Sequence, residues 1–161
     1  MRWGEGRWLG HARGLAGLTL LLLSASCRTA NEPLFTVSGP RWSVRQGQAV
    51  WRPGRRYPEL GGDLMVASHE DGRCAIEFAK TPLALVVAQT TRTNWWIQFP
   101  PAQMRFAGRG APPRRFAWLY LGRALAGEPL PAPLRFQRQP DHGWRLENPR
   151  TGETLEGFLA P

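Results

Sequence analysis

Along most of the chain, apolar and polar residues alternate in short runs, which is the pattern of strands that cover one face of a sheet. The clearest example is a hairpin in which residues 63–69 and 73–80 flank an Asp-Gly turn. The apolar positions that share a face are Leu64 and Val66 on the first arm and Cys74, Ile76 and Phe78 on the second. These runs predict an antiparallel sheet with one covered side.

Other short runs of the same kind predict further strands on both sides of this hairpin. We expect them at 35–37, 41–52, 83–91, 95–99, 134–136, 144–146 and 155–159, and another begins with Met104 and Phe106 before a Gly/Pro loop at 108–113. A change of phase at Gly47 predicts a bulge or turn within 41–52. The Pro and Gly residues of 53–62 predict a loop.

Residues 114–126 form the only good helix candidate after the first 26 residues. Gly127 can end this helix, and Pro129 prevents its continuation. Its apolar side chains are Phe116, Trp118, Leu119, Tyr120, Leu121 and Leu125. So wide an apolar surface predicts either a helix packed on a sheet or one that covers the open mouth of the sheet. The expected fold class is mainly β (α+β), a curved antiparallel sheet or open half-barrel with a covering helix.

The N-terminus has the pattern of an export signal. Three arginines lie within residues 1–13, an apolar run occupies 15–23, and small residues follow at 24–26. The run is shorter than the roughly 20 residues that a membrane span requires.

Residues 23–27, Leu-Ser-Ala-Ser-Cys, resemble a bacterial lipobox, in which the Cys27 thiol would carry lipid and the chain would be cut before it. Several acyl chains hold a protein firmly, because each buried CH₂ contributes about 0.8 kcal/mol. In the commonest pattern Leu stands three residues before the cysteine, where this chain has Ser24. The alternative is an ordinary signal peptide and an unrelated cysteine. The predicted organisation is a signal peptide at 1–26, a tether at 27–33 and one β-rich domain at 34–161.

The formal charge of +9 does not by itself indicate which kind of partner the protein binds. The first 26 residues hold three arginines and one glutamate, so +7 belongs to the rest. The arginines are scattered along the sequence, and we expect no nucleic acid partner. We expect a monomer that contacts the membrane through lipidated Cys27. Arg28 follows the cysteine, where Asp would favour inner-membrane retention, so we expect the outer membrane, on the side facing the periplasm.

No catalytic or metal-binding motif is recognisable in the sequence. His69 and His142 each lie beside a polar turn, where we expect solvated side chains; a metal pair is the alternative. Cys74 is expected to be a small buried residue without a disulfide partner once Cys27 is acylated. The sequence therefore predicts no enzyme, no cofactor and no metal.

Six tryptophans follow residue 26, a high number for a domain of this size. They either fill the core of a twisted sheet or line an apolar pocket for a lipid. The residues we expect to line such a cavity are Trp42, Val66, Ile76, Phe78, Trp95, Ile97, Phe99, Phe116, Leu119 and Tyr120.

Three segments, 125–133, 143–146 and 151–157, resemble those of lipoprotein-localisation (LolA/LolB-like) outer-membrane proteins. The resemblance extends over about residues 40–160. It implies an open half-barrel lidded by helix, whose hydrophobic concavity holds the acyl chains of lipoproteins. In that family the anchored member inserts its cargo into the outer membrane.

Two features depart from that family. The chain predicts one helix where the family uses several as a lid, and it has no obvious exposed leucine on a protruding hairpin. The first functional hypothesis is a membrane-anchored protein that binds acyl chains or lipoproteins in a hydrophobic cavity. The alternative is a structural envelope lipoprotein that docks a protein or the cell wall.

Overall fold

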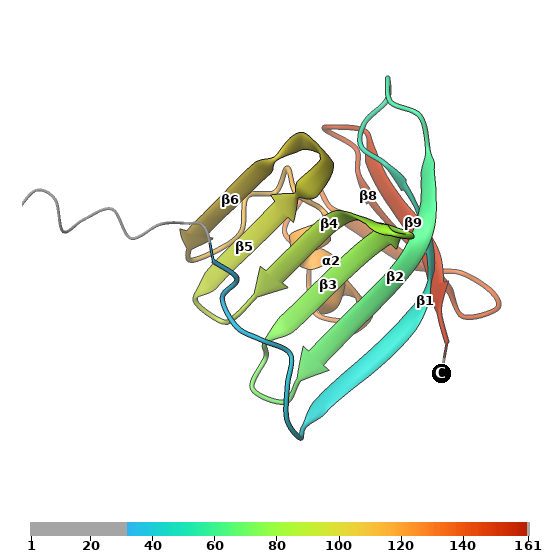
Figure 1. The fold of residues 1–161 in the computed structure, drawn as a ribbon. Coiled ribbons are helices and arrows are strands. Elements are labelled where there is room, and N and C mark those ends of the chain that lie inside the picture. Colours follow the sequence, from blue (N-terminus) through green and yellow to red (C-terminus); the bar gives the residue numbers. More distant parts are fainter. Residues whose placement is uncertain (1–31, 161) are drawn as a thin grey trace, which may run out of the picture. The chain divides into compact units, whose positions relative to one another are not determined.

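The structure, a computed structural model, describes residues 32–160, and these form one open sheet of nine antiparallel strands (Figure 1). The order across the sheet is β6-β5-β4-β3-β2-β1-β9-β8-β7, so β1 pairs with both β2 and β9. The strands are β1 (Trp42–Arg52), β2 (Leu60–His69), β3 (Cys74–Lys80), β4 (Leu83–Thr90), β5 (Asn94–Phe99), β6 (Met104–Arg109), β7 (Arg135–Arg138), β8 (Gly143–Asn148) and β9 (Glu153–Leu159).

The helix α2 (Trp118–Leu125) connects β6 at one edge of the sheet to β7 at the other. It contacts β3, β4 and β5, and we call the face that it covers the inner face and the opposite one the outer face. A short 3₁₀ helix, η2 (Pro100–Ala102), joins β5 to β6. In Figure 1 the sheet is seen from the outer face, with α2 behind it. The mainly β fold with a covering helix is therefore confirmed.

Inner-face residues form continuous rows across the strands, as the alternation predicts. Val66 pairs with Ile76, Ile76 with Ala88, and Ala88 with Ile97, and all four are buried. The predicted hairpin is confirmed, because the His69 N–H donates to the Arg73 carbonyl and closes the β2–β3 turn. Alternation thus identifies the inner face of these four strands.

The bulge predicted at Gly47 is wrong, because β1 pairs with β2 without interruption from Trp42 to Trp51. The glycine serves a different purpose. A Cβ atom there would fall on the Phe158 backbone carbonyl, so only glycine allows β9 to approach β1 so closely. The register irregularity in the sheet lies instead between Phe78 and Ala79, where β3 pairs with β4.

Other predictions also differ from the structure, and β6, for example, extends to Arg109 into the loop predicted at 108–113. Residues 35–37 are not a strand, and the loop predicted at 53–62 ends earlier because β2 begins at Leu60. The helix predicted at 114–126 begins at Trp118, since residues 113–116 form a tight turn closed by a Phe116 N–H···O=C Pro113 bond. The signal peptide and Cys27 lie outside the described residues.

Candidate functional site

Nine of the ten residues expected to line a cavity lie in or against the hydrophobic core beneath α2. Seven are buried, namely Val66, Ile76, Phe78, Trp95, Ile97, Leu119 and Tyr120. The other two, Phe99 and Phe116, are half-buried and pack against this core. The structure therefore brings these nine side chains together, but as members of the core rather than as the lining of a groove.

Aromatic rings fill the space between the sheet and α2. Trp118 stacks on Phe78 with ring centroids 5.1 Å apart, and Trp51 meets Trp118 edge-on at 5.8 Å. Phe116 continues this packing towards the edge of the sheet, 5.9 Å from Phe99. Trp118 and Phe78 are both completely buried. These contacts are those of close-packed core side chains.

Trp42 is the exception among the ten, and its assignment to the cavity is wrong. Its position in β1 alternates with that of the inner-face residue Trp51, so it lies on the outer face. Its ring stacks on Phe35 at 5.5 Å and packs against His69 at 4.9 Å. The Arg73 guanidinium lies over both Trp42 and Phe35, at 5.3 and 5.6 Å. Trp42 thus holds the N-terminal segment rather than a ligand.

That segment, residues 34–41, crosses the outer face, and we call it the strap (Figure 1). The buried Gln89 side chain of β4 binds the Phe35 backbone twice. The Phe35 N–H donates to Gln89 Oε1 at 3.2 Å, and Gln89 Nε2 donates to the Phe35 carbonyl at 2.9 Å. The chain is therefore fixed to the sheet immediately after the predicted tether.

Glu153, at the start of β9, is a buried carboxylate that the sequence analysis missed. Its Oε1 accepts a bond from Trp51 Nε1 at 3.1 Å, and its Oε2 accepts one from the Ala117 N–H at 3.0 Å. Burial raises the pKa of Glu153 to about 7, although both hydrogen bonds favour the charged form. One signal was available, because Glu153 shares its face of β9 with the buried residues Leu155 and Leu159.

In the described part of the chain, Cys74, His69 and His142 do not lie together in one site. Cys74 is partly buried against the core, and burial raises the pKa of its thiol to about 11. The prediction of a solvated His69 is wrong, since its side chain is only 5% exposed beside Trp42. His142 is exposed. Within residues 32–160, no three His, Cys, Asp or Glu side chains are grouped so that they could hold a metal.

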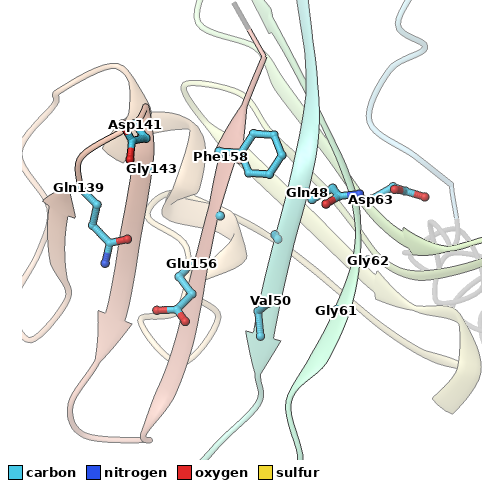
Figure 2. Close-up of a pocket in the computed structure, with 12 residues that line it drawn as sticks. Gln48, Val50, Gly61, Gly62, Asp63, Gln139, Asp141, Gly143, Glu156 and Phe158 are labelled. Atoms are coloured by element: carbon cyan, nitrogen blue, oxygen red, sulfur yellow. The ribbon is translucent and has the colours of Figure 1, made fainter.

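The surface of residues 32–160 carries at least three grooves, and none of these three is lined by any of the ten expected residues. The first, the outer-face groove of about 590 Å³, crosses β2, β1 and β9. Figure 2 shows Glu156 and Phe158 of β9 in it, between Gln139 and Gln48. The charged residues in its lining are all acidic: Asp63, Asp141 and Glu156.

The other two grooves have basic linings. The edge groove, of about 470 Å³, lies at the β4–β5 turn and the end of β6, and contains Arg92 and Arg109. The inner-end groove, of about 350 Å³, lies beside the last turn of α2. It is lined by the apolar residues Leu125, Phe136, Trp144 and Leu159 together with Arg45, Arg138 and His142.

No protein-family model and no curated protein matches the chain. In the described part of the chain, no helix has the length and apolar character needed to cross a membrane.

Proposed function

We propose that this protein is a lipid-anchored component of the bacterial cell envelope that works by docking through its surface. The observation that carries this proposal is the filled space beneath α2. A carrier with an internal cavity needs room for acyl chains between its sheet and its lid. Here Trp118 and Phe78 occupy that room and are in van der Waals contact with the surrounding core.

The strap supports the anchoring half of the proposal. Four residues lie between Cys27 and Glu32, the first residue described, and the five steps from Cys27 to Glu32 span about 18 Å in a fully extended chain. The two Gln89–Phe35 bonds then fix the following residues to the sheet. A lipid on Cys27 would therefore hold the domain close to the membrane, as suits a docking protein at the surface of the bilayer.

The test uses the full chain in three forms: wild type, Cys27→Ala, and Cys74→Ala as the matched cysteine control. We expect an alkyne fatty acid fed to the cells to label the wild type and Cys74→Ala but not Cys27→Ala. Organic extraction of purified Cys27→Ala protein should recover no acyl ligand. Absence of label on the wild type would contradict the lipid anchor. Recovery of a stoichiometric acyl ligand from the purified protein would contradict the docking function and favour a carrier of acyl chains.

A second candidate function, binding of acyl chains, is favoured by the inner-end groove. Its volume of about 350 Å³ lies within the roughly 300–1,000 Å³ of small-molecule sites. The half-buried side chains of Leu125 and Phe136 lie in this groove with the exposed Arg45 and Arg138, a combination that suits an amphiphile with an anionic head. Titration of Cys27→Ala protein with laurate tests it. Arg45→Glu should weaken laurate binding, while Arg56→Glu, far from the groove, should leave it unchanged. Equal binding in both variants would exclude this site.

A further inference from the structure

The positive charge of the domain is concentrated in one continuous segment. Residues 78–127 contain no Asp or Glu, and they contain seven bases: Lys80, Arg92, Arg105, Arg109, Arg114, Arg115 and Arg123. That is the whole net charge of +7 that follows residue 26. The segment includes β4, β5 and β6, so one side of the sheet is basic while the remainder is nearly neutral.

Within this segment, the basic residues nearest the edge of the sheet lie along β6 and in the β4–β5 turn. We call Arg92, Arg105 and Arg109 the basic edge. All three are exposed, and β6 is the last strand on its side of the sheet. In residues 32–160, no carboxylate forms an ion pair with Arg92 or Arg109. Both residues line the edge groove, and no acidic residue does.

The strap places this edge next to the point where the chain leads to Cys27. Phe35 is bound to Gln89, and Arg92 follows Gln89 by only three residues. The opposite end of β4, at Leu83, is about 25 Å away along an eight-residue strand. The β4–β5 turn therefore lies at the end of β4 that is close to Phe35, near the start of the described chain.

From this geometry we propose that the basic edge rests on an anionic lipid surface, with guanidinium groups against lipid phosphates. The inference rests on the proposed anchor, which keeps the edge within reach of the bilayer. Arginine is suited to the contact because its planar fork binds phosphate oxygens in pairs. The attraction falls off within a Debye length of about 8 Å at physiological salt, so only charges held this close to the surface contribute.

The experiment measures membrane binding by the basic edge in the absence of the lipid anchor. It uses the full chain carrying Cys27→Ala. Its partition is measured by flotation with vesicles of phosphatidylcholine alone and with vesicles containing 30% phosphatidylglycerol. We expect binding only to the anionic vesicles, and weaker binding at higher salt. The variant Arg92→Glu/Arg109→Glu should reduce the partition at least tenfold, because each basic residue near such a surface contributes roughly a fivefold effect.

A matched control reverses two exposed arginines at the far end of the sheet, in Arg56→Glu/Arg150→Glu. These residues lie in the β1–β2 and β8–β9 connections, and the net charge changes equally. The control should keep most of the binding, and Arg92→Lys/Arg109→Lys should keep more than the glutamate variant. Thermal melts verify that each variant folds.

Three outcomes would overturn the proposal: equal loss in the two glutamate variants, binding that ignores phosphatidylglycerol, or no vesicle binding at low salt. The last would redirect the search for a partner to an acidic protein. None of these depends on acylation, which the Cys27 labelling experiment measures separately, so failure of the anchor and failure of the edge are distinguishable.

Discussion

Gly122 of α2 lies directly against Cys74 of β3. A Cβ atom placed on Gly122 would stand 2.5 Å from the Cys74 sulfur and 3.2 Å from its Cβ. The helix can therefore pack this close to the sheet because the residues that meet, Gly122 and Cys74, are both small. Glycine usually weakens a helix, so this residue sacrifices helix propensity for closeness of packing.

Gly122→Ala is expected to destabilise the protein by about 1–2 kcal/mol, because overpacking a core outweighs the gain of roughly 1 kcal/mol in helix propensity. Urea denaturation measures the difference. In a Cys74→Ala background the sulfur is gone, and the same substitution should cost less. A double-mutant cycle with no coupling between the two positions would contradict the proposed contact.

Cys74 should react slowly with thiol reagents in the folded protein. Burial raises its pKa from 9.0 to about 11, which leaves about a hundredfold less thiolate near pH 8, and thiolate is the reactive form. We expect iodoacetamide to modify the Cys27→Ala protein slowly at pH 8 and rapidly in urea, as followed by intact mass. Fast modification of the folded protein would show that Cys74 is more open than the packing of Gly122 implies.

Alternation along the chain was enough to predict most of the sheet. Val66, Ile76 and Ile97 lie where a period of two places them, because a strand with one covered face must alternate. Alternation fails for Trp42, since the outer face is itself partly covered by the strap. No local pattern shows that a segment distant in sequence will cover a face that would otherwise be solvated.

The buried polar residues were missed for a related reason. Gln89 and Glu153 are satisfied by partners 54 and 36 or more residues away, so their burial depends on the tertiary fold. The pairing of β9 with β1 likewise cannot be derived from neighbouring residues. The basic edge was missed because its arginines are scattered in sequence, and only the order of the strands gathers them on one side of the sheet.

Gln89→Ala is expected to release the strap, because it removes both hydrogen bonds to the Phe35 backbone. Trypsin should then cut after Arg41 at least about tenfold faster, since cleavage requires the surrounding backbone to open. Gln98→Ala, a substitution of the same kind on the neighbouring strand β5, serves as the control. Intact mass follows the cut, which would separate the domain from the proposed anchor at Cys27. Equal rates in the two variants would mean that other strap contacts suffice.

Glu153 should make stability depend on pH in an unusual direction. Its folded pKa of about 7 lies above the ordinary value of 4.5, so the folded state binds the proton more tightly than the unfolded state does. The stabilisation is complete below pH 4.5 and is lost as the pH rises towards 7. The loss amounts to about 3 kcal/mol for a shift of this size. The titration of Glu153 should therefore lower the melting temperature by several degrees between pH 4.5 and pH 8.

Glu153→Gln separates this titration from all others. The amide still offers one oxygen to Trp51 or Ala117, but its NH₂ group cannot accept the second bond. We expect the variant to be less stable than the wild type at pH 5, by about 1 kcal/mol for one lost hydrogen bond. As the wild-type carboxyl ionises towards pH 8, the difference in melting temperature should shrink or reverse. A difference that stays constant between pH 5 and pH 8 would show that Glu153 does not titrate in this range.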